Sequence, residues 1–197
     1  MKRLFDFVAS SFGLILLTPI FVLIALWIKL DSRGAIFFRQ ERVGFQGALF
    51  RIHKFRTMVL DAEKKGKQIT VGADSRITTV GGFLRKYKLD ELPQLIDVLV
   101  GDMSLVGPRP EVPKYIDCYS DDEKNEVLSV KPGITDNASI EFRSESELLA
   151  NAKDPEVTYI NEVLPKKIAI YRIYVRERSF FGDVAIIFKT IFLIVKK

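Results

Sequence analysis

Hydrophobic residues are unevenly distributed along the chain, and the first long run of them is uncharged from Phe7 to Ile28. About 20 apolar residues suffice for a helix to cross a bilayer, so this run is long enough to span one. Pro19 lies near its middle, where it removes one backbone donor and frees the carbonyl of Ile15. Thr18 beside it can bond a freed backbone group. The pattern therefore predicts a helix that kinks or breaks at Thr18-Pro19.

Three interpretations of this run differ in topology: a signal peptide, a spanning helix and a re-entrant helix. No small-residue cleavage site follows the run, which argues against the signal peptide. Lys2 and Arg3 precede it, and Lys29 and Arg33 follow it. Because Lys and Arg are enriched on the cytoplasmic side of membrane segments, both ends favour the same side. We expect residues 1–30 to form a re-entrant helix–break–helix, with the spanning helix as the alternative.

A second apolar segment occupies residues 180–197 at the C-terminus. It is rich in Ile and Phe, but Asp183 and Lys189 interrupt it and two lysines end it. It is too short and too charged to cross a bilayer, and we expect an amphipathic helix that lies in the membrane interface. A helix of the protein core fits the same periodicity.

The region between these segments alternates short β-prone and helical patterns. Two β-prone runs, Ile36–Arg42 and Leu49–Phe55, flank the letters GFQG and predict a hairpin. Helical patterns precede and follow Asp90, and further ones cover Tyr115–Leu128, Glu145–Ala152 and Tyr159–Tyr174. The predicted fold is α+β and mainly helical: a re-entrant membrane helix, one small hairpin, and interfacial helices around a catalytic core formed by residues 31–197.

Composition adds a segregation of charge to this picture. The chain has 197 residues, 48% of them hydrophobic, and a net charge of +5. Residues 29–109 carry 15 basic and 9 acidic side chains, residues 117–156 carry 4 and 11, and residues 157–197 carry 8 and 3. Basic outer segments suit an anionic surface or anionic ligands. One cysteine and one histidine exclude an intramolecular disulfide and a Cys/His zinc site.

The stretch LRKYKLDELPQL contains the first candidate for catalysis, the adjacent acids Asp90 and Glu91. Acids are common at helix N-termini because of the helix dipole, so a structural role is the simpler explanation for an isolated pair. Neighbouring helical residues point in different directions, however. One carboxylate can attack a phosphorus atom while the other holds a metal ion, provided that nearby cations offset the repulsion.

Candidate cations occur in three other places. Arg109 lies between Pro108 and Pro110, and prolines stiffen the backbone on either side of a phosphate-binding guanidinium. Lys54 and Arg56 share one face of the second predicted strand, since strand neighbours alternate. Arg85 lies five residues before Asp90. Each of these alone is equally explained as an ordinary surface residue, and only their co-occurrence indicates an anion site.

The strings KFRTM, LRKYKLDELPQL, GDMSLVGPRP and KPGIT, in this order behind KRLFDF and LLTPI, resemble the bacterial sugar transferase family. These small monotopic phosphoglycosyl transferases start glycan assembly on polyprenol phosphate. The likeness covers residues 1 to about 135 closely. Thr18-Pro19 matches the family's helix-breaking Ser-Pro with one change, and the letters DNASIEF after KPGIT depart from the pattern of many relatives. Residues 136–165 match no motif.

The resemblance implies a reaction and roles for individual residues. A UDP-sugar donates its sugar 1-phosphate to undecaprenyl phosphate and UMP is released, at the cytoplasmic face of the bacterial inner membrane. Asp90 is implied to be the nucleophile of a covalent phosphosugar intermediate, and Glu91 to bind Mg²⁺. Lys54, Arg85 and Arg109 are implied to line the anion site.

A different class of function, a noncatalytic module that binds anionic lipid or nucleic acid, would also suit a basic chain. The acidic pair among the cations argues against that alternative, because it repels phosphates, and we expect no nucleic acid partner. The identity of the sugar, the glycan pathway and the oligomeric state are not encoded in any pattern that we identify.

Overall fold

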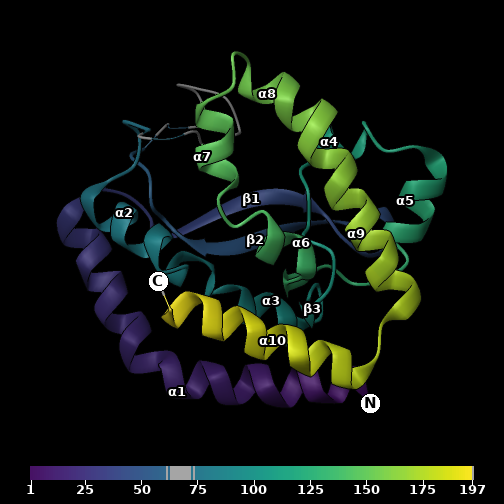
Figure 1. The fold of residues 1–197 in the computed structure, drawn as a ribbon. Helices are drawn as coiled ribbons and strands as arrows, with labels where there is room; N and C mark the ends of the chain where they lie inside the picture. The colour runs from purple at the N-terminus through teal and green to yellow at the C-terminus, as the bar shows by residue number, and fades with distance from the viewer. Residues whose placement is uncertain (61, 63–71, 73, 197) are drawn as a thin grey trace.

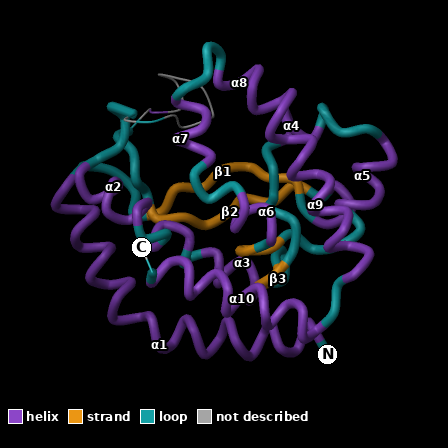
Figure 2. Tube along the Cα trace, viewed as in Figure 1, coloured by secondary structure: helices purple, strands orange, loops and turns teal. Residues whose placement is uncertain are grey.

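A computed structural model describes residues 1–60, 62, 72 and 74–196. Two long helices, α1 (Lys2–Asp31) and α10 (Phe180–Val195), lie along one edge of the molecule, and the other elements are stacked on them (Figure 1). The two helices are in contact at their N-terminal ends, where the rings of Phe5 and Phe180 meet edge to face at 5.2 Å. A hairpin of β1 and β2 crosses the centre of the molecule (Figure 2).

The hairpin confirms the prediction from the sequence to within one residue at each end. Strand β1 (Phe37–Val43) pairs antiparallel with β2 (Leu49–Phe55), from Phe37 opposite Phe55 to Val43 opposite Leu49. The turn η1 (Phe45–Gly47) joins them. Ile52 and Phe55 of β2 are buried and, three positions apart, lie on opposite faces, so both faces of the hairpin carry part of the core.

The helical patterns after the hairpin correspond to helices, most of them short. One prediction is wrong: Tyr115–Leu128 is not a single helix, because Ser120 caps a new one through its side chain and the backbone N–H of Glu123. The helices and helical turns of this region are α2 (Thr79–Lys86), η3 (Leu89–Glu91), α3 (Gln94–Val100), α4 (Pro113–Ile116), α5 (Asp121–Val127), α6 (Asn137–Glu141), α7 (Glu145–Ala150), α8 (Pro155–Thr158), the π-helical turn η4 (Tyr159–Val163) and α9 (Leu164–Glu177).

A two-stranded parallel sheet, which the sequence did not predict, joins distant parts of the chain. Strand β3 (Ser104–Val106) pairs with β4 (Gly133–Thr135). The pairing continues into Gly107, and a side chain on Gly133 would place its Cβ 2.1 Å from the backbone nitrogen of Gly107. Only glycine permits this approach. The sheet therefore fixes where the loop after Gly107 begins.

Helix α1 is continuous, so the predicted helix–break–helix is wrong as a description of its secondary structure. Helical geometry runs through Pro19, although the ribbon bends near its middle (Figure 1). The hydroxyl of Thr18 donates 2.7 Å to the carbonyl of Leu14 rather than to the freed carbonyl of Ile15. A proline and a back-bonded threonine both bend a helix without ending it.

Both ends of α1 contact the same folded body. Near the N-terminus, Asp6 is buried and accepts hydrogen bonds from the hydroxyl of Ser104 and the N–H of Leu105, at 2.8 and 3.2 Å. Near the C-terminus, Ile24 and Ile28 pack into a cluster with residues of β2 and α2. The helix is long and apolar enough to cross a membrane, yet it lies along the protein at both ends.

The outward surface of α1 is apolar over its whole length. Exposed apolar side chains include Leu4, Phe7, Val8, Phe12, Ile15, Leu16, Val22, Leu23, Leu26 and Leu30.

Helix α10 packs on the protein core along one face, and its predicted location in the membrane interface stays a prediction. Its inner face belongs to the protein: Ile186 packs with Val106, and Asp183 is buried, where it accepts a hydrogen bond from the hydroxyl of Tyr174 at 2.9 Å. Its outer face leaves Phe181 83% exposed and Phe188 68% exposed. Helices α1 and α10 thus both expose large apolar side chains.

Candidate active site

Asp90 and Glu91 lie in η3, a single turn between α2 and α3, rather than at the start of a regular helix. The turn follows Lys88, whose backbone is left-handed (φ 57°, ψ 20°), and Pro93 then leads into α3. This change of direction separates the two carboxylates. Asp90 is buried, and Glu91 points toward the loop that carries Arg109.

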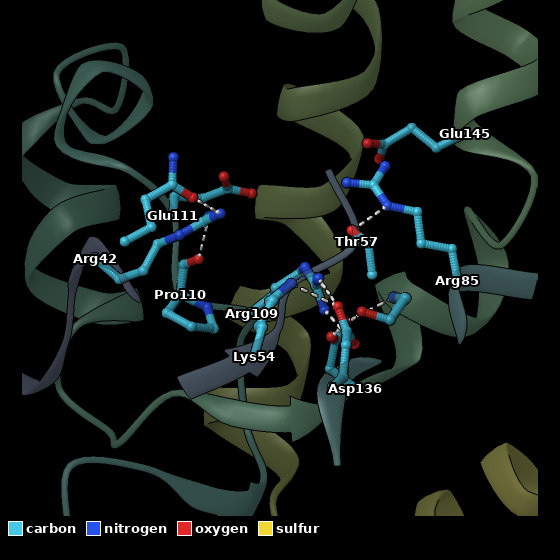
Figure 3. Close-up of polar contacts among 12 residues, drawn as sticks. Arg42, Lys54, Thr57, Arg85, Arg109, Pro110, Glu111, Asp136 and Glu145 are labelled. Atoms are coloured by element: carbon cyan, nitrogen blue, oxygen red, sulfur yellow. Dashed lines mark hydrogen bonds and ion pairs between the residues drawn. The ribbon is translucent and has the colours of Figure 1, made fainter. Parts of the chain in front are cut away.

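Glu91 is the centre of a buried ionic cluster. Its Oε1 accepts a hydrogen bond of 2.7 Å from Lys54 Nζ, and Arg109 donates to both of its oxygens, to Oε2 at 3.2 Å (Figure 3). Burial alone would raise the pKa of Glu91, but the charges of Arg109 and Lys54 hold it well below its usual value. Glu91 is therefore ionised over the whole physiological range.

Asp90 has different surroundings. Its Oδ1 is buried and accepts no hydrogen bond within the described part of the chain. Burial and then the neighbouring charge of Glu91 raise its pKa, while Lys54, Lys88 and Arg85 act in the opposite direction. The result is a carboxylate that is poorly stabilised in the free protein and surrounded by cations, which are the conditions of an activated nucleophile.

The cations of the site have different partners: Lys54 and Arg109 bind Glu91, and Arg85 binds a hydroxyl. Lys54 is the second-last residue of β2, and burial lowers its pKa to about 8 although Glu91 opposes the shift. Arg85, near the end of α2, donates through Nε to the hydroxyl of Thr57 at 2.8 Å. Arg109 has its pKa raised well above normal, chiefly by Glu91. These three residues, which the sequence assigned to an anion site, surround the acidic pair.

The loop around Arg109 is fixed at both of its prolines. The carbonyl of Pro108 accepts from the N–H of Gly133 at 2.9 Å, and the carbonyl of Pro110 accepts from Arg42 Nη1 at 2.9 Å. The backbone on both sides of Arg109 is therefore held in place, and the role of Pro108 and Pro110 in shaping the site stays a prediction.

Arg56, which the sequence also assigned to the site, has another role. Its guanidinium donates to the carbonyls of Ser32 and Arg33 at 2.7 and 2.6 Å, and so it caps the end of α1. Thr18 and Pro19 likewise lie in α1 and contribute no side chain to the acidic pair.

A second buried network, which the sequence did not reveal, lies behind Arg109. Glu111 accepts a hydrogen bond of 2.8 Å from the hydroxyl of Tyr159, and Lys167 lies 3.6 Å from its carboxylate. Lys167 also donates to Glu145 at 3.0 Å. This network joins the segment after Arg109 to η4, α7 and α9. Its members are up to 56 positions apart, so no local pattern could have indicated it.

Asp136 follows the KPGIT motif and lies near enough to Arg109 to feel its charge. It is buried and caps α6 by accepting from the N–H of Ser139 at 2.9 Å. Burial raises its pKa, and the charge of Arg109 partly opposes this shift. The departure from the common motif at this position thus has a structural role as a helix cap.

The acidic pair meets part of the requirement for a magnesium site. Among the described residues no group of three or more His, Cys, Asp or Glu side chains is arranged to hold a metal ion. Mg²⁺ is usually bound by one or two carboxylates together with substrate phosphates and water. Glu91, to which the resemblance assigns the metal ion, already binds two cations, and the free Oδ1 of Asp90 is the atom available for attack on phosphorus. The pair suits an ion that arrives with a phosphate ligand.

Comparison with known proteins agrees with the motifs. The family profile for bacterial sugar transferases matches residues 1–197. The UDP-glucose:undecaprenyl-phosphate glucose-1-phosphate transferase of Escherichia coli K12 is 39% identical over 196 residues, which are 98% of this chain and 39% of that protein. The UDP-N-acetylgalactosamine-undecaprenyl-phosphate N-acetylgalactosaminephosphotransferase of Aeromonas hydrophila is 37% identical over 97% of this chain and 43% of its own length.

The relatives differ in length. The exopolysaccharide production protein ExoY of Rhizobium meliloti is 34% identical over 96% of this chain and 83% of its own length. By contrast, the chain spans only about two fifths of the Escherichia coli and Aeromonas hydrophila proteins.

Proposed function

Because the chain belongs to the bacterial sugar transferase family, we propose that it transfers a sugar 1-phosphate from a UDP-sugar to undecaprenyl phosphate and releases UMP. The observation that carries this proposal is Asp90, a buried carboxylate near the cations Lys54, Arg85 and Arg109, with an oxygen that has no partner in the described part of the chain. Such a group is costly to keep in a protein that does not use it.

The chemistry divides into two displacements at one phosphorus atom. Asp90 attacks the phosphorus next to the sugar, a bond forms between Oδ1 and phosphorus, and the bond to the α-phosphate breaks, so that UMP leaves. A phosphate oxygen of undecaprenyl phosphate then attacks the same phosphorus and releases Asp90. The product is an undecaprenyl diphosphate sugar.

The cations make the first displacement possible. A carboxylate and a diphosphate repel each other, and guanidinium and ammonium groups offset this repulsion. Arg109 is stiffened between two prolines, so little entropy is lost when it shifts from Glu91 to a phosphate oxygen. Glu91 keeps Lys54 and Arg109 in place before the donor binds. Glu91 would hold Mg²⁺, and the ion would supply positive charge against the negative charge of the diphosphate and of the leaving UMP.

The same proposal includes insertion into one membrane leaflet, with the site at the cytoplasmic face. Support comes from α1, which is bent, has an exposed apolar surface, and contacts the folded body through both Asp6 and Ile28. The exposed rings of α10 continue this surface. A cysteine placed ahead of Met1 and the variant Arg33→Cys, each in a Cys118→Ser background, should both react with a membrane-impermeant maleimide from the cytoplasmic side only. Labelling from opposite sides would overturn the single-leaflet arrangement.

The activity is tested by a screen of UDP-sugars with undecaprenyl phosphate and Mg²⁺, with UMP release as the readout. We expect release with at least one donor, dependent on the acceptor, and none from Asp90→Asn. Release from Asp90→Asn at the wild-type rate would refute the assignment of the nucleophile. Absence of release with every UDP-sugar would refute the proposed reaction.

A further inference from the structure

Lys88 adopts a backbone conformation that is unfavourable for lysine. Its φ of 57° is left-handed, and Gln46 in the hairpin turn is the other non-glycine residue with positive φ among those described. Glycine takes this conformation without strain, and asparagine tolerates it better than lysine does. The N–H of Lys88 donates to Arg85 and its carbonyl accepts from Glu91, so the strained residue joins α2 to the acidic turn. Strain next to a reactive group points to a use for the side chain.

Lys88 is also a cation of this region, and its side chain has no partner among the residues that the structure describes. Lys54 and Arg109 bind Glu91, Arg85 binds Thr57, and the ammonium of Lys86 lies 5.5 Å from the ring of Tyr87.

For Lys88, by contrast, the structure shows no side-chain hydrogen bond or ion pair with any described residue. Its side chain is exposed, yet its charge lowers the pKa of both Asp90 and Glu91. It is therefore near the acidic pair and free to meet a ligand.

The residue that follows Lys88 in the sequence borders an apolar hollow of about 560 Å³. Leu89 lines it together with Trp27 and Leu30 of α1 and Phe83 of α2. Trp27 is 44% exposed and Leu30 is 86% exposed, so the hollow opens on the apolar surface of α1. A lysine whose side chain has no partner among the described residues, next in sequence to a residue that lines an apolar hollow, matches a molecule with a phosphate on a hydrocarbon chain. A nucleotide sugar has no such chain.

We propose that Lys88 binds the phosphate of the prenyl phosphate acceptor, and that the hollow beside Leu89 takes the first part of its prenyl chain. The assignment rests on the proposed transferase function. Under this assignment, Lys54 and Arg109 bind Glu91 and the phosphates of the donor. Lys88 binds the phosphate of the acceptor at the boundary with the lipid.

A binding experiment tests this without turnover. Trp27 is the only tryptophan of the chain and lines the hollow, so its emission reports occupancy. The intact protein in nonionic detergent is titrated with geranylgeranyl phosphate and, separately, with geranylgeraniol, which lacks the phosphate. The variants are Lys88→Gly, Lys88→Arg and, as the control for a left-handed backbone, Gln46→Gly.

We expect Lys88→Gly to weaken geranylgeranyl phosphate about tenfold, the effect of one charge-assisted hydrogen bond, and to leave geranylgeraniol unchanged. Lys88→Arg should retain the affinity. Lys88→Gly and Gln46→Gly should both raise the melting temperature, because glycine relieves the backbone strain. A gain in stability with a loss of phosphate affinity separates a binding role from a structural one.

Three results would overturn the proposal. The first is equal affinity of wild type and Lys88→Gly for geranylgeranyl phosphate, and the second is a Trp27 emission that does not respond to either prenyl compound. The third is a kinetic result: Lys88→Gly raises the KM for the UDP-sugar but not for the prenyl phosphate, which would assign Lys88 to the donor. Failure of the wild type to release UMP would instead refute the proposed function, and the binding titration would still decide the role of Lys88.

Discussion

Replacing Glu91 with glutamine should destabilise the folded protein, because it leaves Lys54 and Arg109 in a buried place without their counter-charge. Glu91 receives Lys54 Nζ at 2.7 Å and both terminal nitrogens of Arg109. The side chains of Glu91, Lys54 and Arg109 are 12%, 15% and 25% exposed, so water screens the cluster only partly. Removing one partner of a buried ion pair costs about 3–5 kcal/mol.

The exposure of Arg109 places Glu91→Gln near the lower end of that range, at about 3 kcal/mol. For a chain of this size, 1 kcal/mol shifts the melting temperature by about 2–4 °C, so the expected loss is about 6–12 °C. Thermal unfolding in detergent with EDTA, followed by circular dichroism, measures it. Glu177→Gln is the matched control, since Glu177 is exposed and has no ion pair within the described part of the chain.

A double variant separates the loss of charge balance from a loss of packing. Adding Lys54→Met to Glu91→Gln should recover part of the lost stability, because one stranded cation is removed. A melting temperature of Glu91→Gln within about 1 °C of the wild type would refute the reasoning, since a surface substitution away from such clusters has an effect of that size.

Three further predictions concern single residues of the site and of α1. Asp90→Asn should abolish transfer and keep or raise the melting temperature, because it removes a buried charge whose Oδ1 has no partner; a large loss of stability would contradict this. Lys54 has its pKa lowered to about 8, so it is charged below pH 8 and neutral above it, and kcat/KM should fall as the pH rises through about 8. In Lys54→Arg this alkaline decline should disappear, and an unchanged profile would assign it to another group. Arg56→Ala should lower the melting temperature by about 4–9 °C through loss of the cap on α1, with KM for both substrates unaltered.

The elements that the sequence predicted well are those with a long or regular pattern. Alternation on both sides of GFQG gave the hairpin to within one residue, and the apolar run gave α1. The parallel pair β3–β4 was missed because three-residue strands are too short to show alternation. Their pairing depends instead on Gly107 and Gly133, whose backbones approach closely.

The structure brings Lys54 and Arg109, which the motifs named, to the acidic pair, and it differs from the prediction at Arg56. Lys54 and Arg56 are two positions apart, and strand alternation places both on one face. Strand β2 ends at Phe55, however, so Arg56 leaves the sheet and turns to α1. The left-handed backbone of Lys88 was equally invisible, because its residue type does not favour that conformation.

Incubation of the protein with a UDP-sugar alone, followed by intact mass measurement, tests the central claim most directly. The account predicts a mass increase of one sugar phosphate on a single chain, located on the peptide that contains Asp90 and absent from Asp90→Asn. Hydroxylamine should remove the adduct, as expected for an acyl phosphate, and so should undecaprenyl phosphate. An unmodified mass under conditions in which added acceptor supports full turnover would contradict the covalent mechanism.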